Sequence, residues 1–304
     1  MSEDIPFNRV LDLVPGVVDH VVPGVRRILA DNPGPFTFKG TLSYLVGNGK
    51  VAIIDPGPRD ARHTAALLDA VRGETVTHII VTHTHRDHSP GATAIHAATG
   101  APTYGEGPHR LSRPLFIGET KRLDTGADSE FVPDHRIADG DVITGDGWSL
   151  EAVATPGHTA NHMALALKGT DVLFSGDHVM GWSTSIVAPP DGSMSDYMAS
   201  LHRLVARSET IYLPGHGDMI RDAPEFVARY IAHRRGREAS ILHRLGKGEA
   251  DIPSLVRAIY IGLDPRLVGA AALSTLAHLE DLNARGLVVT EGAPSISGRY
   301  RLPP

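Results

Sequence analysis

The chain has 304 residues, enough for one large domain or for a large domain with a small one. Hydrophobic residues make up 41% and charged residues 21%, as in soluble globular proteins, and the formal net charge of −6 argues against a broad basic surface for nucleic acid. The absence of cysteine excludes disulfides, thiol nucleophiles and thiolate metal ligands. No apolar run of about 18 residues predicts a membrane span. The acidic start lacks the features of a secretory signal, so we expect a cytoplasmic protein.

The first part of the chain predicts strands and helices around a histidine-rich loop. Residues 41–46 and 51–55 are apolar and β-rich, and the Gly-Asn-Gly-Lys between them is typical of a hairpin. Residues 60–71 have apolar positions at helical spacing, and residues 76–81 predict a buried strand. A helix over residues 92–98 is expected to begin beside the histidine-rich loop.

The remainder of the chain divides into an irregular segment, a second strand-rich half and a helical tail. Residues 105–146 are rich in turns and charge, and we expect an irregular insertion near the rim of the site. The second half predicts strands at residues 149–155, 162–168, 171–174 and 210–213 and a helix at residues 196–207. After residue 222 the pattern predicts helices at residues 223–245, 252–261 and about 266–284, then a hairpin over residues 286–302. Helices followed by a hairpin are typical of a winged helix.

The most informative stretch for chemistry is Thr-His-Thr-His-Arg-Asp-His, from Thr82 to His88, directly after the predicted strand at residues 76–81. Because a strand directs alternate side chains to opposite faces, His83 and His85 can point the same way. Imidazole and carboxylate groups suit zinc and other divalent transition metals. Four potential ligands at the point where a strand opens into a loop predict a metal centre.

The spacing His-x-His-x-Asp-His resembles the signature of the metallo-β-lactamase superfamily. Three further residues follow in the order of that family's pattern: His158 in Thr-Pro-Gly-His-Thr, Asp177 in Ser-Gly-Asp-His and His216 in Pro-Gly-His-Gly. The resemblance implies a two-metal site, with one ion held by His83, His85 and His158, the other held by Asp87, His88 and His216, and Asp177 bridging them. Each residue alone has an ordinary explanation, whereas seven in the family's order do not. Zinc is the expected metal, and manganese or iron would accept the same ligands.

The same resemblance implies an α/β fold. It predicts an αββα metallo-β-lactamase sandwich over residues 1–222 and a linking helix with a small winged-helix-like domain over residues 223–304. The tail segments that begin at Leu255 and His278 resemble the tail of the β-lactamase-like protein 2 family. A helical appendage that packs on the core or stabilises a homodimer would explain the tail equally well.

The resemblance implies metal-assisted hydrolysis by an activated hydroxide, with Asp87 and Asp177 as the catalytic carboxylates. The β-lactamase-like protein 2 branch contains endoribonucleases, so cleavage of single-stranded RNA is the first prediction. The candidate phosphate contacts are Arg257, Arg266, Arg299 and Arg301. Only 5% of residues are aromatic, with no clear stripe for stacking bases, so the alternative is a small-ester hydrolase acting on a thioester, lactone or glutathione ester. The complete ligand set disfavours a non-catalytic metal-binding or DNA-binding protein.

Other residues near these motifs have two interpretations each. His162 would contact an anionic group of the substrate or make a structural hydrogen bond. Tyr44 and residues 32–37 are expected to line the pocket mouth, and Trp182 would shape the cleft or lie in the core. Asp55 is expected to anchor a loop rather than to bind metal.

Overall fold

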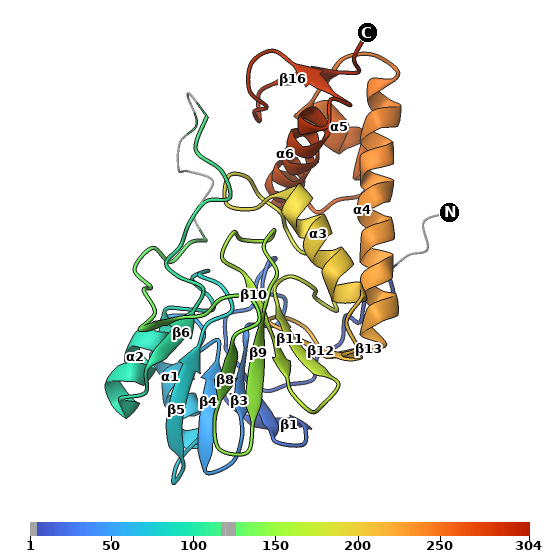
Figure 1. Cartoon of the computed structure of the whole chain (residues 1–304). Helices are drawn as coiled ribbons and strands as arrows, with labels where there is room; N and C mark the ends of the chain where they lie inside the picture. The colour runs from blue at the N-terminus through green and yellow to red at the C-terminus, as the bar shows by residue number, and fades with distance from the viewer. Residues whose placement is uncertain (1–4, 117–118, 120–125) are drawn as a thin grey trace.

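The computed structural model describes residues 5–116, 119 and 126–304, and two sheets packed face to face form its larger part (Figure 1). The strands of the first sheet are β1 (Val18–Val22), β2 (Val25–Leu29), β3 (Leu42–Val46), β4 (Lys50–Ile54), β5 (Thr75–Ile80), β6 (Thr103–Gly105) and β7 (His135–Arg136). They lie in chain order across the sheet. β1 to β4 pair antiparallel, and β4 to β7 pair parallel.

The second sheet has the order β13-β12-β11-β10-β9-β8. Its strands are β8 (Val142–Thr144), β9 (Ser149–Ala154), β10 (Met163–Leu167), β11 (Val172–Gly176), β12 (Ile211–Pro214) and β13 (Ile220–Arg221). β11 and β12 are parallel, and the chain crosses between them through helix α3 (Met194–Val205). The other neighbours are antiparallel.

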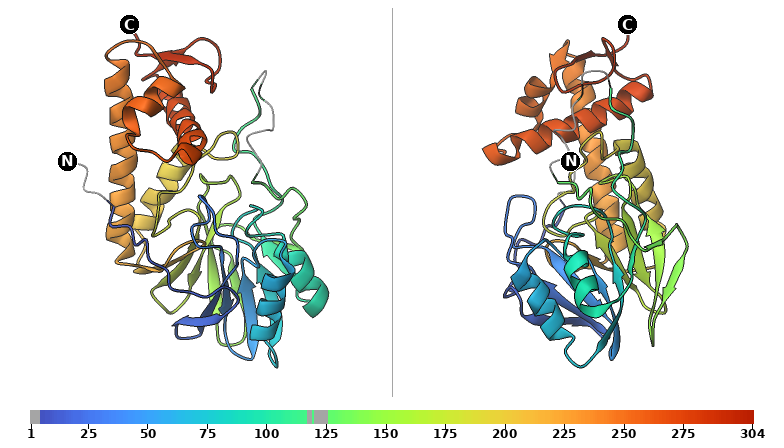
Figure 2. Two further views of the ribbon diagram at one scale, coloured as in Figure 1. Left: turned by 180° about the vertical axis from the view of Figure 1, so that it is seen from behind. Right: turned by 90° about the vertical axis from the view of Figure 1, so that its left-hand side faces the viewer.

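Helices cover the outer face of each sheet (Figure 2). α1 (Ala61–Ala70) and α2 (Gly91–Thr99) bury Leu67 and Ile95 against the first sheet. α3 (Met194–Val205) and the long α4 (Ala223–Leu245) lie against the second sheet. The predicted αββα sandwich is therefore confirmed.

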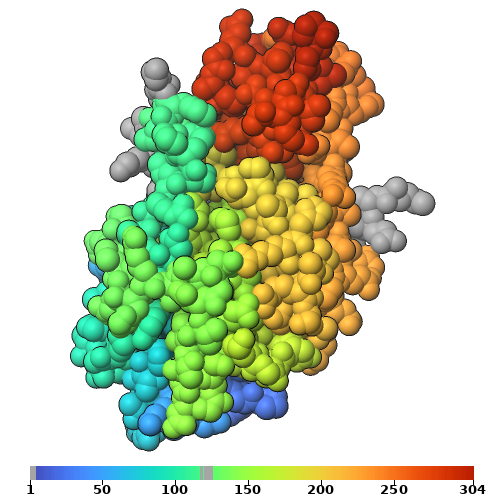
Figure 3. Space-filling model, viewed as in Figure 1, coloured from blue at the N-terminus to red at the C-terminus, as the bar shows by residue number. Residues whose placement is uncertain are grey.

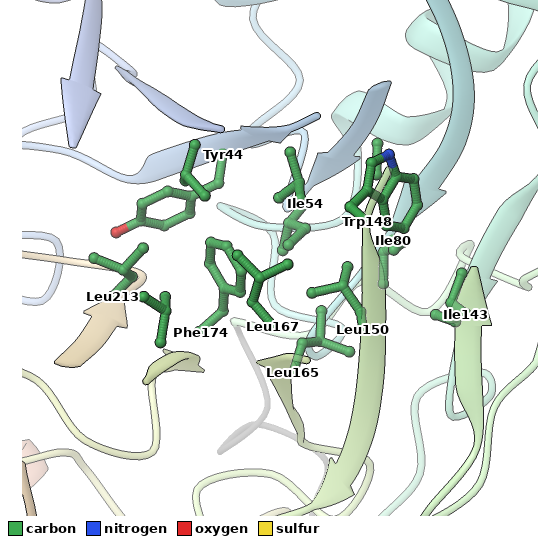
Figure 4. Packing of buried hydrophobic residues seen from close by; sticks show 14 of the residues in the cluster. Tyr44, Ile54, Ile80, Ile143, Trp148, Leu150, Leu165, Leu167, Phe174 and Leu213 are labelled. Carbon is green, nitrogen blue, oxygen red and sulfur yellow. The ribbon is translucent and has the colours of Figure 1, made fainter. Parts of the chain in front are cut away.

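The space between the sheets is filled by alternate residues of the facing strands (Figure 4). In β3, Tyr44 points inward while Leu45 packs under the helices of the first sheet, and in β10, Leu165 points inward while Ala164 faces α3 and α4. This alternation follows from the two-residue period of a strand. Each large side chain buried in this way contributes about 1.5–3 kcal/mol.

The tail folds around a separate core above the sandwich (Figure 3). Its elements are β14 (Ala250–Asp251), α5 (Ile252–Ile259), a 3-10 turn (Pro265–Leu267), α6 (Val268–Ala284), β15 (Val289–Thr290) and β16 (Arg299–Arg301). The three short strands form a small sheet in the order β14-β16-β15. Helices followed by this sheet agree with the predicted winged helix.

Helix α4 belongs to both parts of the molecule. Its first half packs Val227 and Tyr230 against the second sheet and α3, and its last turns pack Ile241 and Leu245 in the core of the tail. The predicted domain boundary at residue 222 stays a prediction, since the helix that follows it contributes to both cores.

Most predicted elements occur within one or two residues of their expected ends, but the strands β1, β2, β6, β13 and β14 were not predicted. In β2, Arg26 and Arg27 interrupt the apolar pattern that would indicate a strand. Arg27 is nevertheless buried, and it pairs with Asp19 at 2.7 Å and with Asp218 at 2.8 Å. The expected irregular segment at residues 105–146 also contains β7 and β8. Among the described helices, none is long and apolar enough to cross a membrane.

Candidate metal centre and adjoining cavity

The seven predicted ligands lie on loops at one edge of the sandwich. Four of them follow β5, in the stretch His83–His88. His158 lies between β9 and β10, Asp177 follows β11, and His216 follows β12. Strand ends at a shared sheet edge bring residues that are distant in sequence together, and all seven meet here in two groups.

The first group consists of His83, His85, His158 and Asp177, whose ligand atoms lie within 4.8 Å of one another. The Nδ1 atom of His85 is 3.1 Å from the Nε2 atom of His83 and 3.1 Å from that of His158. Three ring nitrogens therefore converge on one point.

The second group consists of Asp87, His88 and His216. The Oδ2 atom of Asp87 is 3.1 Å from Nε2 of His216 and 3.4 Å from Nε2 of His88. Asp177 lies between the groups, because its carboxylate is 3.7 Å from Nε2 of His158, 3.5 Å from that of His88 and 3.3 Å from that of His216. This position suits a bridging carboxylate.

Each imidazole uses its other nitrogen for a partner outside the group. These contacts are His83 Nδ1 to Thr82 Oγ1 at 3.0 Å, His85 Nε2 to Asp191 Oδ2 at 3.4 Å, His88 Nδ1 to Asp55 Oδ2 at 2.9 Å, His158 Nδ1 to the Ile186 carbonyl at 2.6 Å, and His216 Nδ1 to the Gly40 carbonyl at 3.1 Å. Such partners fix the orientation and the tautomer of metal-binding histidines. Five rings are thus held with one nitrogen free to bind a metal.

Two buried polar atoms in the cluster lack a hydrogen-bond partner, Nε2 of His88 and Oδ1 of Asp177. Leaving a buried polar atom unpaired costs about 1–3 kcal/mol, so such atoms normally have a partner. A divalent cation at each group would satisfy both atoms. The donor set therefore fits two metal ions, and their binding here stays a prediction.

The two groups differ electrostatically. Burial and the neighbouring histidines lower the pKa of His83, and burial lowers that of His158 to about 4, so both rings are neutral near pH 7. At His88 and His216, burial opposes ionisation, yet the surrounding carboxylates outweigh it and raise the pKa, to about 10 for His216. Protons thus occupy the second group when no metal is bound, and a metal ion would displace them.

Asp55 anchors the histidine-rich loop. Its Oδ1 atom accepts a hydrogen bond from the Thr82 backbone N–H at 2.8 Å, and its Oδ2 atom accepts one from the Thr82 hydroxyl at 2.7 Å. Its backbone has a φ of 50°, a left-handed conformation that non-glycine residues adopt only where the surroundings impose it. Asp55 belongs to neither ligand group.

A cavity of about 440 Å³ opens beside the ligands. Its lining contains ligands of both groups, and most of its other lining residues are apolar. The apolar wall consists of Phe36, Met180, Ile186, Ala188, Ala270 and Leu273. Ala270 and Leu273 lie on α6, so the tail closes one side of the cavity.

Three sequence-based interpretations near this cavity need revision or refinement. Tyr44 does not line it: the ring lies between the sheets (Figure 4), and its hydroxyl donates to the Pro214 carbonyl at 2.7 Å. His162 is buried, with Nδ1 2.8 Å from the Thr155 hydroxyl and Nε2 accepting from the Asp177 N–H at 3.1 Å. Its nitrogens are occupied, so the structure favours the structural alternative. Phe36, from the predicted pocket mouth, does line the cavity.

Sequence reasoning missed several residues of the site. Asp191, in Pro-Pro-Asp-Gly, lines the cavity and contacts His85, yet only its turn-like context marks it in the sequence. Ile186, Ala270 and Leu273 carry no sequence signal for this position, because they are ordinary apolar residues brought there by the fold.

Comparisons with known proteins agree with this architecture. Residues 36–216 match the family described as the metallo-beta-lactamase superfamily, and residues 252–298 match the beta-lactamase associated winged helix domain. A "Beta-lactamase-like protein 2 homolog" of Caenorhabditis elegans is 34% identical over 76% of this chain and 74% of its own length. "Thioesterase pkgB" of Emericella nidulans is 31% identical over 76% of this chain and 62% of its own length. The crystal structure of a metallo-beta-lactamase family protein of Thermus thermophilus matches with a TM-score of 0.74, at 25% identity, over 93% of this chain and 99% of that one.

Proposed function

The chain belongs to the metallo-β-lactamase superfamily, whose members are generally hydrolases, and we propose that it hydrolyses small thioesters or esters that carry an apolar acyl group. The observation that carries the proposal is the apolar lining of the cavity into which both ligand groups open. A cavity of about 440 Å³ has the size typical of small-molecule sites. The fungal relative named a thioesterase supports the same substrate class.

The charge of the cavity favours an ester over a polyanion. Among its lining residues, the only Lys or Arg is Arg86, whose Nε atom already donates to the Ala127 carbonyl at 2.9 Å. The wall also contains three carboxylates, those of Asp87, Asp177 and Asp191. Two bound divalent ions would offset these carboxylates, but beyond the ions the lining offers a phosphodiester chain only one partly engaged cation.

The chain supplies positions for two metal ions and for the substrate. When bound by the two ligand groups, the ions would polarise the scissile carbonyl and make water nucleophilic near neutral pH. Asp177 would hold both ions at a fixed separation, and the Oδ2 atom of Asp87, which accepts from the Thr41 hydroxyl at 3.2 Å, is kept toward His216. Met180, Ile186 and Leu273 would hold the acyl chain out of water.

Cleavage of single-stranded RNA is the second candidate, favoured by four exposed arginines of the tail. Two of them are already paired, Arg266 with Asp264 and Arg299 with Glu249. Arg257 and Arg301 form no ion pair with the described residues, and they remain for phosphate contact. None of the four lines the cavity, which is why we place this activity second.

The test is turnover by the purified zinc-loaded protein on a panel of acyl thioesters, an aryl lactone and single-stranded RNA. We expect thioester hydrolysis that improves as the acyl chain lengthens and that chelator abolishes. RNA cleavage without thioester hydrolysis would contradict the proposed ester hydrolysis and support the second candidate. No hydrolysis of any member, with two metals bound, would contradict both.

A further inference from the structure

A second cavity of about 350 Å³ adjoins the first, between α4, α6 and the loop after β11. The two cavities share the wall residues Phe36, Met180, Ile186 and Ala270. A molecule whose reacting bond lies at the ligand groups could therefore extend past these residues into the second cavity.

The charge of the second cavity is the reverse of the first. It is lined by Arg9, Arg234 and Arg237 together with His233, and none of its lining residues is acidic. Within the described part of the chain, none of the three arginines forms an ion pair. Arg9 is exposed, and Arg237 lies over the Tyr260 ring at 4.5 Å and donates to the Ile259 carbonyl at 3.1 Å.

Arg234 carries a buried positive charge without a counter-charge. Its side chain lines the cavity, yet the residue is 4% exposed, and its Nε atom has no hydrogen-bond partner. Its Nη2 atom donates to the Ser185 carbonyl. The Tyr197 ring, 5.1 Å from the guanidinium, compensates part of this charge, but no anion neutralises it. A buried charge without an anionic partner is costly, and proteins retain one where a ligand compensates it.

The histidines around Arg234 add no further positive charge to the cavity. Burial, followed by the charges of Arg234 and Arg237, lowers the pKa of His233 to about 4. Burial and the same arginines lower the pKa of His278 to about 3, and neither of its ring nitrogens has a partner. Both rings are neutral near pH 7, so the electric field of the cavity remains that of the arginines.

We propose that the second cavity is a subsite for an anionic group of the substrate, a phosphate or a carboxylate remote from the scissile bond. Arg234 and Arg237 would bind this group directly, and Arg9 would attract it from the open side. The inference rests on the proposed thioester or ester hydrolysis. It narrows the substrate class to an acyl group esterified to a thiol or alcohol that carries a terminal anion.

The experiment compares three thioesters of one fatty acid that differ only in the thiol. These are S-acyl phosphopantetheine, with a phosphate; S-acyl glutathione, with carboxylates; and S-acyl N-acetylcysteamine, which is neutral. Arg237→Gln should raise KM about 10- to 100-fold for the charged thioester that the subsite accepts, because a charge-assisted hydrogen bond is lost. KM for the neutral thioester should stay unchanged. The charged thioester whose KM rises shows whether the subsite binds a phosphate or a carboxylate.

The matched control is Arg235→Gln, which removes the same charge from the same helix at an exposed position that contacts His202 and lies outside the cavity. It should leave all three KM values unchanged. Arg9→Gln disturbs no hydrogen bond or ion pair of the described residues, so it removes charge without breaking a polar contact. We expect the KM for the charged thioester to rise about threefold, and high salt should remove this effect. Equal effects of Arg237→Gln on charged and neutral thioesters would contradict the subsite.

A binding measurement separates this inference from the proposed function. Titration calorimetry of the metal-loaded protein should show tighter binding of phosphopantetheine than of pantetheine, or of glutathione than of its diester, and Arg237→Gln should remove the difference. If no thioester is hydrolysed but this difference is present, the function fails and the anion site stands. If neither anion binds more tightly than its neutral analogue, the anion site is wrong even where hydrolysis occurs.

Discussion

The ligand loops and the cavity walls belong to one site, but they are encoded differently. Four ligands fall within His83–His88, and each of the others is flanked by a short motif at a strand end. The apolar wall instead combines Phe36, Ile186 and Leu273, which come from a loop near the N-terminus, a loop after β11 and a helix of the tail. The residues that bind the metals can therefore be recognised from local sequence motifs, whereas substrate preference depends on how distant segments pack.

The strongest way to test this difference is to remove the residue that both ligand groups share. Asp177→Ala would leave two metal ions with poorly compensated charge and without a bridge, so we expect hydrolysis to fall by several orders of magnitude. Elemental analysis should show fewer than two metal ions per chain, while circular dichroism should show an intact fold. Turnover close to that of the parent protein would show that Asp177 does not bridge the groups.

An intermediate effect is expected where a wall residue supports a ligand. Asp191→Asn weakens the contact to Nε2 of His85, which lies at 3.4 Å. Loss of such a supporting carboxylate typically lowers metal affinity by about 10- to 100-fold, and competition with a chromogenic chelator would measure this. Asp171→Asn, at the exposed contact to the Thr210 hydroxyl, is the matched control. Unchanged metal affinity would show that Asp191 lines the cavity without supporting His85 as a ligand.

A smaller effect is expected from the tail's contribution to the wall. Leu273→Ser should raise KM about three- to tenfold for long acyl chains, because apolar contact is replaced by a hydroxyl, and should leave short chains unaffected. Val268→Ser, at an exposed position of the same helix, provides the comparison. An equal loss for acetyl and long-chain substrates would mean that α6 does not contact the acyl group.

The smallest effect concerns the ion pairs that join the segment after β6 to the tail. Arg113 pairs with Glu280 of α6 and with Glu119 at 2.7 Å. Figure 1 shows this segment rising beside the tail. Arg113→Ala should lower the free energy of unfolding by about 1 kcal/mol, since the groups are only partly buried. Arg59→Ala, at an exposed pair with Glu130, should change it by less, as measured in urea.

The sequence indicated the metal ligands because their chemistry needs particular side chains at particular strand ends. It also indicated both sheets, since residues such as Leu42–Val46 and Met163–Leu167 are mostly or entirely apolar. It failed where tertiary contacts override local pattern. Arg27 is buried in β2 only because Asp19 and Asp218 neutralise it, and no local pattern reveals those partners. The prediction that Tyr44 lines the pocket was wrong for a related reason. Side chains alternate between the two faces of β3, and the sequence alone does not show which face packs between the sheets.

The anion-binding residues illustrate the same limit. Arg234 and Arg237 lie on a helix rich in charge, where the sequence suggests a solvated surface. Only the packing of α4 against the loop that contains Ser185 reveals that one of these charges is enclosed.

The long helix α4 has a consequence for how the molecule holds together as a folding unit. Its 23 residues span about 35 Å, and Tyr230 near one end and Leu245 at the other are each fully enclosed by a different core. Unfolding of either core removes the contacts that hold one part of α4, and the loss of these contacts destabilises the other core. The sandwich and the tail should therefore melt together in one cooperative transition. A chain ending before Ala223 would remove Val227 and Tyr230 from the core that they share with α3, and the apolar surface exposed in this way would favour aggregation.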